Sequence, residues 1–176
     1  MFLVSNEAMV VAASNAGGIG TFPALNYRPI ENYRKALREM RSKTKGPIGI
    51  NIIAQSSNKW RDEQLSIALE EGADLIITSL GNPKDIIQRT RGTKAKVFAD
   101  VIGLEHAKKV ADMGADGLIA VGAGAGGHAG ETSLFALVPY LKSKIDLPLI
   151  AAGSIGDGST MLAALALGAD GVYMGT

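Results

Sequence analysis

The sequence contains no cysteine and only two histidines among its 176 residues. The missing thiols exclude disulfide bonds, thiolate nucleophiles and cysteine-ligated metals, and two imidazoles are too few for a histidine metal cluster. We therefore expect no metal site. The lack of cysteine, together with an N-terminal stretch (residues 1–11) that has no basic n-region, predicts a cytoplasmic protein without a signal peptide.

The sequence also lacks an excess of charge of either sign and any long apolar run. The chain has 18 basic and 17 acidic residues, so no net field would attract nucleic acid or an anionic membrane. No apolar run reaches the roughly 18–20 residues needed to cross a bilayer. With 47% apolar and 20% charged residues, the chain is predicted to fold around a buried core rather than to be disordered.

Glycine is abundant, with 22 residues against six prolines, and part of it belongs to a repeat. The tripeptide Gly-Ala-Asp occurs at 72–74, 114–116 and 168–170, each time after a helical pattern and before a short apolar run. Glycine suits the left-handed position just past a helix. Apolar strands that alternate with helices indicate a parallel sheet covered by helices.

Seven helices and seven strands in alternation are expected on this basis. Predicted helices are 6–16, 30–43, 62–71, 84–91, 104–113, 134–143 and 159–167, and predicted strands are 18–21, 48–53, 75–79, 96–100, 117–121, 149–152 and 171–174. An open doubly wound sheet and a closed (β/α) barrel both fit, and seven near-equal units favour the α/β barrel. In either fold, ligands bind beyond the carboxyl ends of the strands.

Two glycine-rich segments follow predicted strands. Residues 153–158 form a turn that opens a helix, which suits a phosphate. Gly153 and Ser154, together with Gly175 and Thr176 after the last strand, are the candidate phosphate residues. The alternative is that these glycines serve only tight turns.

The second segment, residues 122–130, carries one titratable side chain, His128, among small residues. The small residues let a flat ligand lie against the backbone, and a neutral imidazole accepts a proton from a weakly acidic carbon. Asn51, in the predicted strand 48–53, could hydrogen-bond the edge of a cofactor ring or only cap a turn. Helix 30–43 has a basic bias that is expected to be a solvated face, with an acidic partner as the alternative.

Four segments together resemble the nitronate monooxygenase family, formerly called 2-nitropropane dioxygenases, to which flavin-dependent enoyl-acyl-carrier-protein reductases are related. They are residues 14–26 (SNAGGIGTFPALN), 125–130 (AGGHAG), 151–158 (AAGSIGDG) and 173–176 (YMGT). The resemblance covers essentially the whole chain in the right order. It implies a (β/α)8 TIM-type barrel that binds FMN.

Carried over by position, the resemblance assigns functional residues. The FMN phosphate would bind at Gly153, Ser154, Gly175 and Thr176, within a motif that also contains Tyr173 and Met174. Asn51, Gly126 and Gly127 would contact the flavin, and His128 would be the base that takes the α-proton of a nitroalkane or orients the nitronate. The implied reaction is oxidation of an alkyl nitronate by O2 to a carbonyl compound and nitrite.

This chain departs from the family's usual residues at several positions, namely Gly124 for Glu, Ser154 for Gly, Ala99 for His and Val121 for Gln. Two alternatives therefore stay open. One is an NAD(P)H-dependent flavin reductase acting on quinones or enoyl thioesters, and the other is a non-catalytic phosphate-binding barrel fragment.

A (β/α)8 barrel typically needs about 250 residues. Residues 1–176 are thus expected to form a single, partial FMN-binding domain that lacks the barrel's first strand, its last helix and the substrate lid. Exposed strand edges favour self-association into a homo-oligomer.

Overall fold

The computed structural model describes residues 1–175, which form two compact units, Met1–Val97 and the residues from Phe98 onward. The prediction of one single domain stays a prediction.

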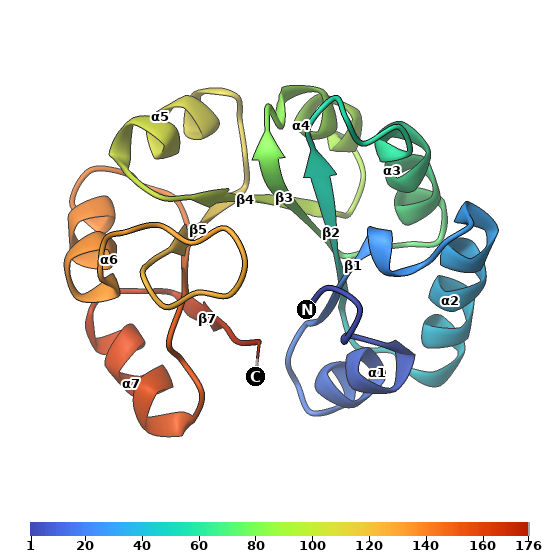
Figure 1. Cartoon of the computed structure of the whole chain (residues 1–176), viewed down its shortest axis with the longest axis horizontal. Coiled ribbons are helices and arrows are strands. Elements are labelled where there is room, and N and C mark those ends of the chain that lie inside the picture. Colours follow the sequence, from blue (N-terminus) through green and yellow to red (C-terminus); the bar gives the residue numbers. More distant parts are fainter. Residues whose placement is uncertain (176) are drawn as a thin grey trace. The chain divides into compact units, whose positions relative to one another are not determined.

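The first unit is a parallel β-sheet of strands connected by helices, drawn in blue to green in Figure 1. Its strand order is β1-β2-β3, with Phe22 opposite Ile50 and Ile50 opposite Ile76. In chain order the elements are α1 (Glu7–Asn15), β1 (Gly20–Pro23), the 3-10 helix η1 (Ala24–Asn26), α2 (Ile30–Lys43), β2 (Ile48–Ala54), α3 (Arg61–Glu70), β3 (Leu75–Gly81) and α4 (Lys84–Thr90).

The second unit repeats this pattern from yellow to red, with parallel strands in the order β4-β5-β6-β7. All five residues of its central strand β5 are buried, as expected for a parallel sheet with both faces covered. Its elements are β4 (Lys96–Val101), α5 (Leu104–Asp112), β5 (Gly117–Val121), α6 (Leu134–Lys142), β6 (Leu149–Ala152), α7 (Gly158–Ala166) and β7 (Gly171–Tyr173).

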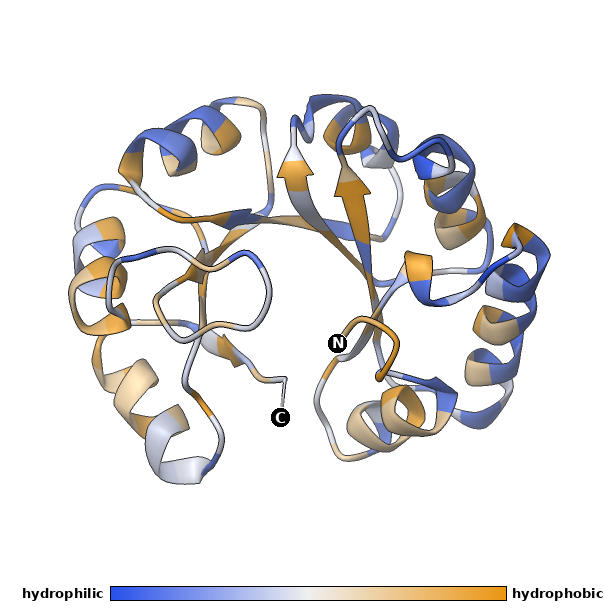
Figure 2. Ribbon diagram, in the orientation of Figure 1, coloured by the Kyte–Doolittle hydropathy of each residue, from blue (hydrophilic) through white to orange (hydrophobic). Residues whose placement is uncertain are grey.

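Apolar strands and amphipathic helices supply the core of each unit, and Figure 2 shows the orange strands against helices with blue outer faces. In the first unit Phe22, Ile50 and Leu37 are fully buried, and the Phe22 ring lies 6.1 Å from that of Tyr33. In the second unit the fully buried residues include Leu118. Within residues 1–175 no helix has both the length and the apolar character needed to cross a membrane.

The predicted alternation is confirmed, but the first strand is misplaced in the prediction. It runs over Gly20–Pro23 instead of 18–21, because Gly18 lies in the turn that caps the end of α1. The Gly18 N–H donates to the Ala13 carbonyl at 3.1 Å, after Gly17 has turned the chain at φ +91°. The short helix η1 was also not expected from the sequence.

Two aspartates of the Gly-Ala-Asp repeat tie neighbouring strands together at their amino ends. The Asp74 N–H donates to the Ile48 carbonyl at 2.9 Å, and the Asp74 carboxylate accepts the Ile48 N–H at 2.9 Å. Asp170 makes the same pair of bonds with Leu149, at 2.8 and 2.7 Å. The repeat therefore aligns the start of one strand with the start of the next in both units.

Cations complete each of these aspartate sites. Asp74 pairs with Arg41 and, at 2.9 Å, with Lys94, while Asp170 pairs with Lys142 at 2.9 Å. Partial burial acts to raise the pKa of Asp74, but hydrogen bonds from Arg41, Ile48 and Lys94 outweigh it and hold this pKa below its ordinary value. The Leu149 N–H and Lys142 likewise lower the pKa of Asp170.

Replacing Asp74 by Asn should lower the free energy of unfolding by about 1–3 kcal/mol, because the variant loses charge-assisted bonds to Arg41 and Lys94. Urea unfolding followed by circular dichroism measures the change. Asp62→Asn is the control, since the Asp62 side chain is 65% exposed and its ion pairs with Arg61 and Arg89 should contribute less than about 1 kcal/mol.

The Asp74→Asn variant also tests how the stability of the fold depends on pH. A carboxylate whose pKa is lower in the folded than in the unfolded chain stabilises the fold above its unfolded pKa, and this contribution disappears as the pH falls through the folded value. The wild-type protein should thus lose more stability than Asp74→Asn between pH 6 and the acid range below about 4. Parallel acid curves for the two proteins would contradict the assigned role of Asp74.

Candidate functional site

Three neighbouring strands of the second unit end at the same level. Val121 of β5 lies opposite Ala152 of β6, and Ala152 lies opposite Tyr173 of β7. The segments that follow these strands therefore begin side by side at the carboxyl edge of the sheet. Together with Tyr173, the last residue of β7, they contain all the candidate site residues except Asn51.

The turn after β6 begins with a glycine that no other residue could replace without strain. Gly153 has φ +134°, and a Cβ at this position would lie 3.0 Å from the Ala125 nitrogen and 3.2 Å from the Ala123 oxygen. The loop after β5 thus packs directly on the Gly153 backbone, and glycine permits both the dihedral angle and the close approach.

Ser154, the next residue, also adopts the left-handed conformation, with φ +52°. Its N–H donates to the Gly124 carbonyl at 3.1 Å. Its hydroxyl is exposed and makes no hydrogen bond within residues 1–175, so it is free to bind a ligand. The phosphate role of Gly153 and Ser154 stays a prediction.

The loop after β5, residues 122–133, is the broad orange loop between β5 and α6 in Figure 1. The Gly122 N–H donates to the Ala152 carbonyl at 2.9 Å, which extends the pairing of β5 with β6 by one residue. The Ala123 N–H donates to the Thr132 carbonyl at 2.8 Å and closes the base of the loop. This leaves the tip of the loop projecting from a fixed base.

The tip of this loop carries Gly126, Gly127 and His128, all exposed. A Cβ added at Gly126 or Gly127 would meet no atom within 4 Å, so the backbone there faces open space. The His128 imidazole makes no hydrogen bond within the described residues. The loop therefore offers bare backbone next to one imidazole that is available to a ligand.

The start of helix α7 differs from the expected phosphate site. The Asp157 carboxylate accepts the Thr160 N–H at 2.8 Å, and the Thr160 hydroxyl in turn accepts the Asp157 N–H at 3.1 Å. The Thr160 N–H, with help from the Thr160 and Ser159 hydroxyls, lowers the pKa of Asp157 to about 2. A negative charge thus occupies the N-terminus of α7.

The end of β7 contributes the remaining residues of the second unit. Tyr173 is half-buried in the last strand, while Met174 and Gly175 follow it and are exposed. Thr176, the last predicted phosphate residue, lies outside the described residues.

Asn51 belongs to the first unit and lies in the middle of β2, opposite Ile77. Its side-chain amide donates to the Ser79 hydroxyl at 2.5 Å. This bond orients the amide and leaves the Asn51 carbonyl oxygen as an acceptor. The role of Asn51 toward a cofactor stays a prediction.

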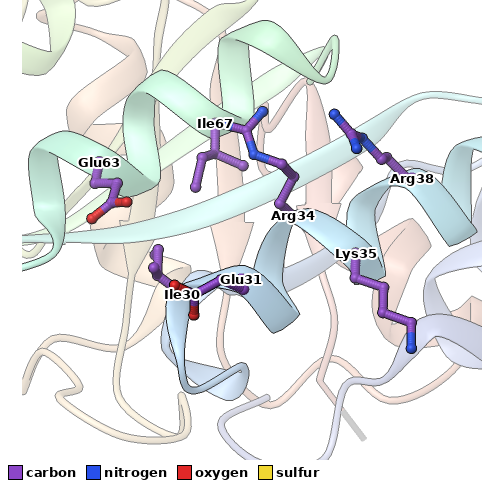
Figure 3. A pocket seen from close by; sticks show the side chains of 7 residues that line it. All are labelled: Ile30, Glu31, Arg34, Lys35, Arg38, Glu63 and Ile67. Atoms are coloured by element: carbon purple, nitrogen blue, oxygen red, sulfur yellow. The ribbon is translucent and has the colours of Figure 1, made fainter.

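The basic bias of helix α2 belongs to the helical layer of the first unit. Arg34 contacts Glu70 and Glu71 at 2.7 and 2.8 Å, and Arg38 contacts Glu71 at 2.9 Å. Figure 3 shows Arg34 and Arg38 at an open groove of about 280 Å³ lined by residues of α2 and α3. Carboxylates from the end of α3 thus neutralise much of this charge.

Two features of the site were missed in the sequence. The Asp157 cap has a recognisable signal, because Asp followed three residues later by a hydroxyl residue is close to a capping box. The contact of Ser154 with Gly124 has no local signal, since the two residues are thirty positions apart. Within residues 1–175 no group of three or more His, Asp or Glu side chains could hold a metal ion.

Comparison with known proteins gives the relatives of this chain. A dehydrogenase of Rhodococcus jostii that is named for a hydroxy-methyl-oxo-octahydroindene carboxyl-CoA is 32% identical over 175 residues, which are 98% of this chain and 48% of that protein. A nitronate monooxygenase of Paraburkholderia phytofirmans is 29% identical, with 98% and 60% covered. The chain spans about half the length of the Rhodococcus relative.

Among solved structures, that of FabK from Thermotoga maritima superposes with a TM-score of 0.90 and 37% sequence identity, over 97% of this chain and 54% of that one. This likeness confirms the predicted (β/α)8-type fold class. The family model for nitronate monooxygenase matches residues 1–176, the whole of the sequence. The chain therefore belongs to the nitronate monooxygenase family.

Proposed function

We propose that this chain belongs to a flavin-dependent oxidoreductase and that its cofactor is FMN. Membership of the nitronate monooxygenase family supports an oxidoreductase with a flavin. The observation that carries the proposal is the bare backbone of Gly126 and Gly127 beside an available imidazole, in a loop whose base packs on the Gly153–Ser154 turn. A flat ring system with a phosphate tail has the shape and charge that such a pair of segments would bind.

The residues present fit this cofactor in two ways. The exposed Ser154 hydroxyl, with Gly175 and Thr176 from the following strand end, would hold the phosphate, and the Asp157 carboxylate would direct it away from the start of α7. Gly126 and Gly127 would let the ring approach the backbone, since no side chain stands in that space. Tyr173, Met174 and the Asn51 carbonyl oxygen are proposed as further contacts.

The reaction proposed first is the oxidation of an alkyl nitronate by O2 to a carbonyl compound and nitrite. His128 is the proposed base, because an imidazole that the protein leaves unbonded can accept a proton from the carbon next to a nitro group. When bound, the flavin would supply the electron transfer between the organic substrate and oxygen. His128, together with the loop that carries it, would thus place the substrate and move its proton.

A second candidate is an NAD(P)H-dependent reductase acting on a quinone or an enoyl thioester. The observation in its favour is that the 32% identical relative is named for a CoA-linked substrate. The family's usual Glu is also replaced here by Gly124, which removes a carboxylate from the loop of His128.

Flavin binding can be tested with a single methyl group. Gly126→Ala should leave the unfolding temperature unchanged, because its Cβ would enter open space, yet it should weaken FMN binding about tenfold or more by blocking approach of the ring. Absorbance and fluorescence titrations with FMN measure the affinity. Gly158→Ala is the matched control, since its Cβ also meets nothing within 4 Å but lies at the start of α7.

Equal FMN affinity in Gly126→Ala, Gly158→Ala and the wild-type protein would reject the proposed ring position. A wild-type protein that stays colourless after FMN is added would reject the cofactor itself.

The base role of His128 predicts a split between two forms of one substrate. His128→Ala should lower kcat/KM for a neutral nitroalkane by about 10²–10⁴, and much less for the preformed nitronate, which has already lost its proton. Oxygen consumption with nitroethane and with ethyl nitronate measures both values. His106→Ala, on helix α5, is the control, and an equal loss with both substrate forms would show that His128 does not act as a base.

The two candidate reactions differ in what reduces the flavin. Stopped-flow absorbance should show reduction by propyl nitronate and little reduction by NADH or NADPH if the first proposal holds. Fast reduction of the flavin by NADPH, without turnover of nitronate, would reject the first proposal in favour of the reductase.

A further inference from the structure

Gly124 and Ser154 occupy one another's space in the second unit. A Cβ added at Gly124 would overlap the Ser154 hydroxyl oxygen and would lie 3.2 Å from the Ser154 Cβ. The backbones of the two residues are also joined, because the Ser154 N–H donates to the Gly124 carbonyl at 3.1 Å. A serine side chain thus stands where position 124 has none.

The conformation of Ser154 shows that this contact is held by its surroundings. Its φ of +52° is one that glycine adopts freely and serine adopts only when other contacts favour it. Those contacts are the bond to Gly124 and the packing of Gly153 against Ala123 and Ala125. The turn after β6 and the loop after β5 are therefore fitted to each other, backbone against backbone.

We propose that Ser154 is a positioning residue for the loop that carries His128, and that positions 124 and 154 form a matched pair in which the Ser154 side chain fills the space beside a residue that has none. Glycine is also favoured at 124 by its own φ of +86°. Through this pair the Gly153–Ser154 turn holds the base of the loop, and so holds Gly126, Gly127 and His128. The consequence of this pair for FMN binding rests on the proposed function. A phosphate bound to the Ser154 hydroxyl would fix the side chain that stands over Gly124.

The test is a double-mutant cycle between the two positions. Gly124→Ala, Ser154→Ala and the double variant are compared with the wild-type protein. Ser154→Ala keeps a Cβ and the same backbone demand at position 154 but removes the hydroxyl that a new Cβ at 124 would overlap. The comparison therefore isolates the contact from any relief of backbone strain.

Two measurements without ligand report the coupling, namely urea unfolding and amide hydrogen exchange of residues 123–129. In the Ser154 protein, Gly124→Ala should speed amide exchange in this segment about tenfold. In the Ser154→Ala background, the acceleration caused by Gly124→Ala should be at least threefold smaller. Gly158→Ala combined with Ser154→Ala is the control cycle and should be additive. Additive effects at 124 and 154 in both measurements would overturn the proposal.

FMN affinity, measured on the same proteins, separates this inference from the proposed function. If the matched pair also serves the cofactor site, Gly124→Ala should weaken FMN binding more in the Ser154 protein than in the Ser154→Ala background. Coupled unfolding and exchange in a protein that does not bind FMN would leave Ser154 as a positioning residue and reject the cofactor. Additive effects in a protein that binds FMN would reject Ser154 as a positioning residue and leave the cofactor proposal standing.

Discussion

The alignment of strands in both units depends on an aspartate that bonds twice to the first residue of the preceding strand. Asp74 does this with Ile48 and Asp170 with Leu149, through one N–H and one carboxylate oxygen each. Because strands of a parallel sheet have a fixed rise per residue, setting the register at the amino ends also sets the level of the carboxyl ends. The level ends of β6 and β7, and so the closeness of the segments that follow them, begin with this alignment.

Glycine has two different roles at the candidate site. Gly153 is required by the protein itself, because its dihedral angle is positive and the backbone of the next loop stands against it. Gly126 has no such neighbour and no positive φ, so nothing within the described chain explains the lack of a side chain there. Gly127 also faces open space, but its φ of +75° already favours glycine. The absence of a side chain that the fold does not need is what directs attention to a ligand.

Much of this arrangement could be predicted from the sequence, because it is local. Helix α2 has the predicted bounds, and the strands β5 and β6 are also correct to the residue, since apolar runs between glycine-rich turns mark them clearly. The start of β1 could not be predicted, because Gly18 can end a helix or begin a strand and a single hydrogen bond to Ala13 decides. The Ser154–Gly124 contact was out of reach for a different reason, since only the folded chain brings the two residues together.

The loop closed by Ala123 and Thr132 has a consequence for how proteins of this kind can diverge. Its ends are joined by a hydrogen bond of 2.8 Å, and the glycine that closes it, Gly130, packs against the Val121 carbonyl. The entropy cost of a longer loop rises only slowly with its length once the ends are fixed. Insertions between these ends can therefore lengthen the tip and bring in new side chains while the sheet below keeps its register.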